Sequence, residues 1–376
     1  MRAHHARRTP LASLGQDILA LFSPIALSLF TSSVAFAQEN QETPPAADAP
    51  AASPAPAQDE SGPKADEAAP PPPAPAEAAA ADAPPAAEPA KPKPPPYSLP
   101  FQLRPAAAAT AVRLDTSMGF YKDPVTGNSA STVVPILLAS YKVTKELAPL
   151  VRVGFVQNSP PDPPAGAAKT DSSFGLLNPL LGATYAIQPS KETKLAFFLG
   201  VTLPIGSGGG DSPDKAAKVA RSVGLNTRSA FDNALFAVND LTVIPGVDFA
   251  YVAGGFTAQV EATLFQLTRV RGSADQKDSS KTNFTTGLHL GYFLVPELSI
   301  GAEIRHQRWL STPDAVKNDK TGSLRDTTTV AFGPRLHFQI GEGKWFRPGV
   351  SLSLPLDDPM KKASYKVVQL DLPFSF

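Results

Sequence analysis

The last thirteen residues, "SYKVVQLDLPFSF" (364–376), alternate apolar and polar side chains up to the final position. Successive side chains of an extended strand point to opposite faces, so one face collects Val368, Leu370, Leu372, Phe374 and Phe376. The end of a soluble domain usually frays in water. A strand that is patterned to its last residue is therefore expected to be held at an apolar boundary.

The same alternation recurs throughout residues 98–376 and predicts an all-β fold. Twelve strands are expected, at 110–121, 132–143, 149–158, 174–187, 194–204, 238–252, 255–271, 282–294, 298–309, 327–340, 345–356 and 363–376. Short turns alternate with longer loops, and the longest loop is 205–237. This asymmetry is typical of a transmembrane antiparallel up-and-down β-barrel of the outer membrane, and an even strand number places both barrel ends on the short-turn, periplasmic side.

The composition of the polar faces separates this prediction from a soluble sandwich, which would alternate in the same way because one face packs a core. In 329–340, for example, Gly333, Arg335 and His337 share the face opposite Phe332 and Leu336. Such a mixture of small and charged residues favours a water-lined interior with the apolar faces in lipid. Closing the sheet would also leave no unpaired edge in hydrocarbon.

Residues 1–37 are predicted to be a signal peptide. Arginines at 2, 7 and 8 precede an apolar run over 18–36, and Ala35 and Ala37 form a small-x-small cleavage site. The alternative is an uncleaved membrane anchor, which Pro24 within the run disfavours as a permanent helix.

Residues 38–97 are predicted to be a disordered linker in the periplasm. Residues 39–97 hold 18 prolines and 20 alanines but only one aromatic residue, Tyr97, so they cannot bury enough apolar surface to fold. The linker is either an inert spacer or an arm that contacts peptidoglycan or a periplasmic protein partner.

Composition excludes several other functions. The 376 residues carry a formal net charge of zero, so there is no general attraction to nucleic acid, and the absence of cysteine excludes disulfides, thiolate metal sites and cysteine nucleophiles. His289, His306 and His337 lie in separate predicted strands, and His306 shares the lipid-side face of Ile304. No local serine–histidine cluster stands out, so we expect no metal, no cofactor and no enzymatic activity.

Charged residues on the polar faces are the candidate lumen and selectivity residues. They are Arg113, Arg152, Glu261, Arg269, Arg271, Glu303, Arg305, Arg335 and Arg347, with Asp115, Asp248 and Asp371 as further acids. A slightly cationic pore would favour anions. The alternative is that these charges pair across strands and simply fill a narrow barrel.

The loop 205–237 is the other candidate for selectivity. Ala216, Ala217, Val219, Ala220 and Val223 predict a short helix capped by Ser212 or Asp214. The loop could constrict the mouth of the barrel, or it could be an ordered external loop.

Two stretches of the chain resemble known bacterial sequences. The terminal Phe376 with its alternating apolar partners resembles the C-terminal signal that bacterial outer-membrane proteins present to their assembly machinery, although Pro373 departs from the usual pattern. The stretches "GLLNPLLGATYAI" (175–187) and "LAFFLGVTLPIGSG" (195–208) resemble an outer-membrane transporter family of the phenol-degradation meta-pathway type. The residues that carry this match are Asn178, Pro179, Gly182, Leu203, Pro204 and Gly206.

The resemblance to the transporter family implies a lipid-embedded channel for passive passage of a small solute, with aromatic or hydrophobic compounds as the expected class. The rival hypothesis is a plugged structural barrel that acts as an envelope tether or adhesin through its proline-rich arm.

Overall fold

The computed structural model of the chain describes residues 97–123, 127–161, 171–211, 214–272, 279–311 and 313–376. The predicted signal peptide with Ala35 and Ala37, residues 38–96 of the predicted linker and the predicted cap Ser212 lie outside the described residues.

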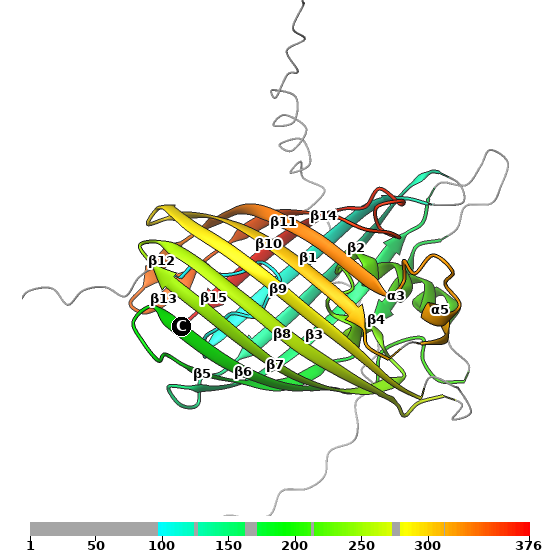
Figure 1. Ribbon diagram of the computed structural model, residues 1–376, viewed down its shortest axis with the longest axis horizontal. Helices are drawn as coiled ribbons and strands as arrows, with labels where there is room; N and C mark the ends of the chain where they lie inside the picture. The colour runs from blue at the N-terminus through cyan, green and yellow to red at the C-terminus, as the bar shows by residue number, and fades with distance from the viewer. Residues whose placement is uncertain (1–96, 124–126, 162–170, 212–213, 273–278, 312) are drawn as a thin grey trace, which may run out of the picture. The chain divides into compact units, whose positions relative to one another are not determined.

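A closed antiparallel β-barrel forms the body of the structure, as the sequence predicts (Figure 1). Three of the twelve expected wall strands are each divided into two shorter strands. The divided pairs are β4 with β5, β11 with β12, and β13 with β14, so the fifteen strands correspond to twelve wall positions. The strands are β1 (Ala111–Lys122), β2 (Ser129–Ser140), β3 (Leu147–Ser159), β4 (Ser173–Leu176), β5 (Leu180–Ile187), β6 (Thr193–Thr202), β7 (Asp240–Ala253), β8 (Phe256–Arg269), β9 (Ser280–Val295), β10 (Leu298–Trp309), β11 (Asp326–Leu336), β12 (Phe338–Gly341), β13 (Lys344–Phe346), β14 (Gly349–Pro355) and β15 (Lys366–Ser375).

The final strand closes the ring by pairing with the first. β15 pairs with β1 without a register break from Ala111 opposite Ser375 to Phe120 opposite Lys366. Phe376 continues the pairing, because its backbone N–H donates to the carbonyl of Thr110 at 3.0 Å. Pro373 lies opposite Arg113 within this seam and does not shift the register. The patterned C-terminus is therefore a wall strand up to Ser375, and the backbone of Phe376 is still hydrogen-bonded to Thr110.

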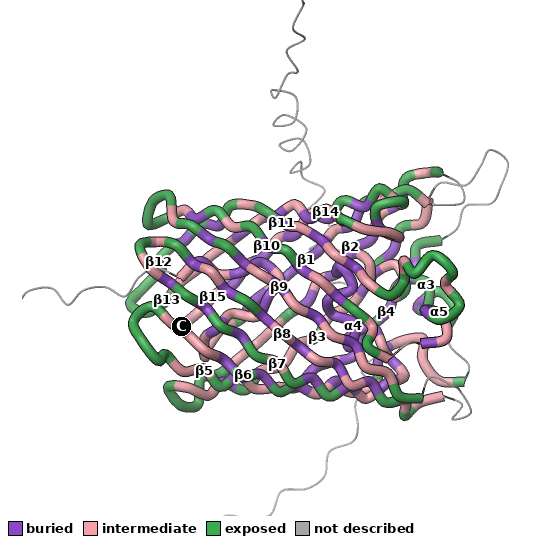
Figure 2. Tube along the Cα trace, viewed as in Figure 1, coloured by how far each residue is buried: buried purple, intermediate pink, exposed green. Residues whose placement is uncertain are grey.

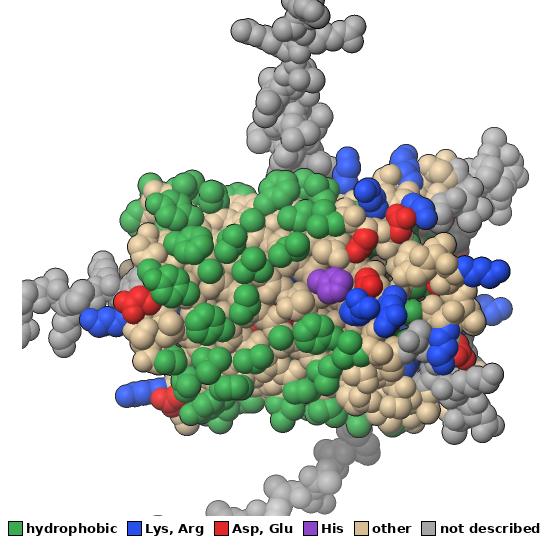
Figure 3. Space-filling model, viewed as in Figure 1, with side chains coloured by type: hydrophobic (Ala, Val, Ile, Leu, Met, Phe, Trp, Pro, Cys, Tyr) green, Lys and Arg blue, Asp and Glu red, His purple; other side chains and the backbone are tan. Residues whose placement is uncertain are grey.

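The outer face seen in Figure 3 carries the apolar half of the alternation, and Figure 2 shows that buried positions alternate with less buried ones along the strands. Large apolar side chains on every side of the barrel are exposed, among them Leu137, Val153, Phe197, Ile304 and Phe332. Aromatic residues gather near the short turns, including Tyr185, Tyr251, Tyr292, Phe338 and Phe376. Charged side chains concentrate at the opposite, loop end (Figure 3).

Short helices lie in the loops at that end. They are α3 (Lys215–Thr227), α4 (Asn233–Phe236) and α5 (Asp314–Lys317). No helix among the described residues is long and apolar enough to cross a bilayer.

The break between β4 and β5 falls at Asn178 and Pro179, two of the residues behind the family resemblance. The buried Asn178 side chain accepts a hydrogen bond from the N–H of Gly206 at 3.0 Å and donates one to the carbonyl of Ala237 at 2.8 Å. This residue therefore ties together the two ends of the long loop between β6 and β7, and it fixes where that loop leaves the barrel wall.

The interior of the barrel is not uniformly polar. The inward face of β2 carries Val134 and Ile136, which are buried with Leu180, Phe198 and Ile244 in the main apolar cluster. α4 contributes Leu235 and Phe236 to the same cluster. The water-lined interior expected from the sequence is therefore wrong at this cluster, where α4 and the inward apolar side chains of the wall pack together.

Candidate functional site

An irregular segment at the start of the described chain, residues 97–107, lies inside the barrel; we call it the lumen segment. Phe101 and Leu103 are 1% and 0% exposed, and Ala106 is also buried. Buried backbone N–H and C=O groups need hydrogen-bond partners, and a segment without regular structure cannot supply its own. The barrel wall has to provide them.

Side-chain oxygens of the wall accept hydrogen bonds from the N–H groups of the lumen segment. Both oxygens of Glu303 on β10 are used, one by the N–H of Phe101 and the other by that of Gln102 at 3.2 Å. Glu261 on β8 accepts from the N–H of Arg104 at 2.6 Å. Each of these is a charge-assisted bond, which is stronger than a bond between neutral groups.

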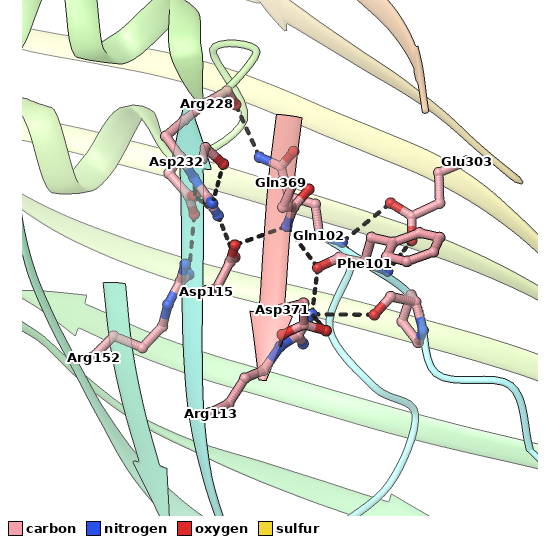
Figure 4. A network of polar contacts seen from close by, with 12 residues as sticks. Phe101, Gln102, Arg113, Asp115, Arg152, Arg228, Asp232, Glu303, Gln369 and Asp371 are labelled. Carbon is pink, nitrogen blue, oxygen red and sulfur yellow. Dashed lines mark hydrogen bonds and ion pairs between the residues drawn. The ribbon is translucent and has the colours of Figure 1, made fainter. Parts of the chain in front are cut away.

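Guanidinium groups of the wall donate to the carbonyls of the same segment (Figure 4). Arg113 on β1 donates to the carbonyls of Pro100 at 3.1 Å and of Phe101. Arg335 on β11 donates to the carbonyls of Leu99 at 3.2 Å and of Pro100 at 3.1 Å. Asp371 on β15 binds both guanidiniums, at 2.6 Å to Arg113 Nε and 2.5 Å to Arg335 Nη2. One carboxylate therefore orients both donors.

Side chains of the lumen segment add further contacts. The hydroxyl of Tyr97 donates to Gln259 and accepts from the N–H of Ala106 at 3.0 Å. The Arg104 guanidinium lies 3.3 Å from Asp248 and 3.2 Å from Glu261, and it stacks 4.6 Å from the ring centroid of Phe198.

Glycines on the inward faces make room for the segment. A Cβ at Gly287 of β9 would lie 2.5 Å from Leu103 Cδ2, and one at Gly291 would lie 2.3 Å from Ser98 Oγ. A Cβ at Gly301 of β10 would lie 3.1 Å from the Phe101 ring. At these three positions the wall carries no side chain, and the lumen segment occupies the space.

The loop between β6 and β7 enters the barrel from the other end. Asp214 caps α3, accepting from the N–H of Ala216 at 2.8 Å and of Ala217 at 3.2 Å, so one of the two predicted caps is observed. α3 packs against β1, β2, β3 and β4. Residues 227–236, from the end of α3 through α4, are buried throughout; we call them the inserted loop.

Arg228 holds the inserted loop in place. Its fully buried guanidinium binds Asp115 of β1 at 2.8 Å and Asp232 of the loop at 2.7 Å, and it donates to Ser117 Oγ at 2.8 Å. Arg152 of β3 binds Asp232 at 3.0 Å from the other side. The carbonyl of Arg228 accepts from the amide of Gln102 at 2.9 Å, so the inserted loop and the lumen segment touch.

A cavity of about 70 Å³ remains between the two. One part of its lining is apolar and includes Ile136, Leu138, Leu150, Phe198, Phe231 and Phe265. The other part is charged and comprises Arg104, Arg113, Asp115, Arg152, Asp232 and Glu261. The cavity can therefore contact both an apolar body and a polar group of a small molecule.

The structure places the predicted lumen residues in two groups. Arg113, Arg152, Glu261, Glu303, Arg305 and Arg335 are on the inward faces of the strands, and Arg305 donates to Ser353 Oγ at 2.8 Å. The other three lie nearer the rims. Arg269 is 4.0 Å from Asp240, Arg271 donates to the carbonyl of Gly206 at 2.8 Å, and Arg347 stacks 5.0 Å from the Trp345 ring. Their roles in selectivity stay predictions.

Sequence reasoning missed the lumen segment and the ion pairs of the inserted loop. It places Tyr97 in the linker and gives no role to Arg104, Arg228 or Asp232. The inward glycines of β9 and β10 are a signal for the lumen segment, because they mark a close approach of another part of the chain. Nothing in the spacing of Arg228 and Asp232 distinguishes them from an exposed helical pair.

Among the residues that the structure describes, a serine–histidine contact lies inside the barrel. Ser299 Oγ and His337 Nε2 are 2.8 Å apart, and Phe293 packs on the histidine ring. Both residues are buried, and Ser98 of the lumen segment covers the serine at 3.4 Å. Among the described residues no group of three metal-ligating side chains is found.

No protein-family model and no curated protein matches the sequence. Solved structures of similar shape include an outer-membrane channel from Pseudomonas putida F1, with 12% identity, a TM-score of 0.43 and coverage of 73% of this chain and 98% of that one. The KdgM porin shares 9% identity over 70% of this chain and 99% of its own, with a TM-score of 0.38. The translocator domain of the autotransporter NalP from Neisseria meningitidis has 13% identity, a TM-score of 0.36 and coverage of 72% and 89%. At these identities the likeness concerns the fold alone.

Proposed function

We propose that this protein is an outer-membrane channel for passive passage of a small solute, and that the structure represents its closed state. The apolar outer belt, the aromatic side chains near the short turns and the difference between turns and loops are features of barrels in that membrane. With this orientation the lumen segment would enter from the periplasm and the inserted loop from outside.

The observation that carries the proposal is the manner in which the lumen is filled. The inserted loop is held by the apolar cluster that Leu235 and Phe236 join and by the ion pairs of Arg228, and a cavity lies beside its contact with the lumen segment. The lumen segment is held largely by side-chain hydrogen bonds and ion pairs of the wall. Such contacts can be exchanged for water as the segments move, whereas a continuous apolar core would oppose opening. The barrel wall closes through its own strand ladder, to which neither insertion contributes a strand.

The mixed lining of the cavity supports a solute that has a compact apolar body and a polar group. Phe198, Phe231 and Phe265 would contact the body, and Arg152 offers a wall guanidinium to the polar group. An aromatic compound fits this description. Because the lumen arginines are paired with acids, we do not propose a general preference for anions.

Planar-bilayer recordings of the purified full chain test the channel. We expect small, brief conductance steps, which become larger and longer-lived in Arg228→Ala because the inserted loop loses its bonds to β1. Lys215→Ala, at the exposed start of α3, is the matched control and should behave as the unmodified chain. Silence of all three proteins, each shown to be folded by a heat-modifiable gel shift, would disprove the channel.

The plugged barrel with a tethering arm is the second candidate, and the extent of lumen filling favours it. It predicts no conductance from any folded variant, together with a weakened envelope in cells whose arm (residues 38–96) is deleted. A weakened envelope together with normal solute uptake in those cells would favour the tether, and an intact envelope would count against it.

A further inference from the structure

We propose that the charged wall of the lumen is a binding site for an extended peptide, and that the lumen segment occupies it as a reversible ligand. The site consists of Arg113, Glu261, Glu303, Arg335, Gln369 and Asp371. Its chemical class of ligand is a short, extended polypeptide interrupted by proline. This inference goes beyond solute passage, and its binding test does not depend on whether the barrel conducts.

The wall side chains form hydrogen bonds mainly with backbone atoms of the lumen segment. Glu303 and Glu261 accept from three N–H groups of the segment, those of Phe101, Gln102 and Arg104. Arginines and amides donate to carbonyls: Arg335 to Leu99, Arg113 and Arg335 to Pro100, Gln369 to Phe101 and Gln259 to Arg104. Because these contacts satisfy backbone groups and not particular side chains, the wall could bind other extended segments of similar shape in the same way.

The two prolines fit the same view. Pro100 and Pro105 have no N–H, so they reduce the number of buried donors the wall has to satisfy. They also restrict the segment to extended conformations before it binds, which lowers the entropy cost of binding. The side chains of Phe101 and Leu103 fill the spaces at Gly301 and Gly287, so these two positions would select an apolar residue.

The nature of the contacts makes the ligand exchangeable. The segment shares no strand ladder with the wall, and most of its backbone bonds end on side chains. The lumen segment is tethered to the barrel, so it competes for the site at an effective concentration on the order of millimolar. A free peptide can therefore displace it in two cases: when a mutation weakens binding of the tethered segment, or when the free peptide also reaches millimolar concentration. Release of the segment from the wall, by a competing peptide or by tension on the preceding chain, would open this half of the lumen.

Binding of a synthetic peptide with the sequence of residues 97–106 tests the site. The receptor is the full chain carrying Leu103→Asp, which places a charge at a fully buried position and should expel the tethered segment. We expect saturable binding of the fluorescent peptide by anisotropy in detergent. A receptor that also carries Glu303→Gln should bind at least tenfold more weakly.

Peptides methylated on single backbone nitrogens give the sharper comparison. Methylation at Arg104 removes the N–H that Glu261 accepts and should weaken binding at least tenfold. Methylation at Leu99 is the control, because no partner for its N–H is found among the described residues and the residue is half-buried. Equal binding of both methylated peptides, or no binding of the unmodified one to a folded receptor, would overturn the proposal.

A second measurement covers the case in which the Leu103→Asp chain does not fold. The chain has no cysteine, so Ser98→Cys in the otherwise unmodified protein reports release of the segment through its rate of reaction with a maleimide. Ser98 is 1% exposed, and millimolar free peptide should raise the rate several-fold. If the reaction rate did not change with peptide concentration, the lumen segment would be a permanent part of the wall, and the inference would fail. Peptide binding without any conductance would leave this inference standing and would instead contradict the proposed channel.

Discussion

Arg113 on β1 and Asp371 on β15 form a bidentate ion pair across the strand pairing that closes the barrel. Their atoms lie 2.6 Å apart between Nε and Oδ1 and 3.0 Å apart between Nη2 and Oδ2. The same guanidinium donates to the lumen segment, and the same carboxylate binds Arg335. Closure of the barrel and retention of the segment therefore depend on one buried cluster.

We expect Asp371→Asn to destabilise the barrel strongly. The change leaves two buried guanidiniums without their shared carboxylate, and breaking a buried ion pair costs about 3–5 kcal/mol. The free energy of unfolding in guanidinium chloride, measured on protein in detergent, would report the loss. Asp326→Asn is the control, because its pair with Arg308 is 3.6 Å long and well exposed, and such pairs contribute about 1 kcal/mol or less. Equal losses for the two variants would show that the seam does not depend on Asp371.

Gly291→Ala should loosen the lumen segment while leaving the wall intact. The new Cβ would lie 2.3 Å from Ser98 Oγ and 2.4 Å from Ser98 Cβ, closer than to the wall atom His289 Nε2 at 2.8 Å, and overpacking of this kind costs about 1–3 kcal/mol. Gly291 is paired with Gly301 on one side and Thr257 on the other, so its strand is fixed in the sheet. The lumen segment should therefore shift, and the strand should stay in place. Hydrogen exchange should accelerate at the amides of Phe101, Gln102 and Arg104.

The matched control for that variant is Gly341→Ala, where a Cβ would meet nothing closer than 3.6 Å. Its exchange rates in the lumen segment should equal those of the unmodified chain. Faster exchange in the β9 ladder itself, without faster exchange in the segment, would contradict the assignment of the strain to Ser98.

A disulfide between positions 98 and 299 should lock the lumen segment. The two serine oxygens are 3.4 Å apart, and the chain has no other cysteine with which the new pair could exchange. Oxidised Ser98→Cys/Ser299→Cys protein should show fewer and smaller conductance steps than the same protein after reduction. Both single-cysteine variants should be indifferent to oxidant. Identical conductance in the two redox states would mean that the solute path bypasses the segment.

The fold was predictable because its signals are local. Period-two alternation, turn residues and the patterned C-terminus each depend on neighbours in the sequence, and together they predict the strand number and the closure of β15 on β1. The helix in the long loop and its Asp214 cap were predictable for the same reason, because both depend on residues close together in the sequence.

The filling of the lumen was not predictable in this way. The bond from Tyr97 to Gln259 joins residues 162 positions apart, and that from Phe101 to Glu303 spans 202. In the sequence the lumen segment continues the proline-rich linker, and its prolines at 100 and 105 argue against a strand. Apolar residues on inward faces, such as Ile136, have the same chemistry as those on the outer surface, so alternation alone does not show what lies opposite them.

The cavity makes a prediction about solute passage that neighbouring positions on one strand can test. Leu138 of β2 lines the cavity, whereas Leu137 is 43% exposed on the outer surface. Leu138→Phe puts a bulkier side chain into a space of about 70 Å³, so it should reduce uptake of a labelled aromatic compound into liposomes several-fold. Leu137→Phe adds the same atoms to the outer surface and should leave uptake unchanged.

Neither variant alters a residue that binds the lumen segment or the inserted loop through a hydrogen bond. Equal uptake by both would exclude the cavity from the solute path, even if the barrel conducts ions, and equal loss in both would indicate a general defect in assembly.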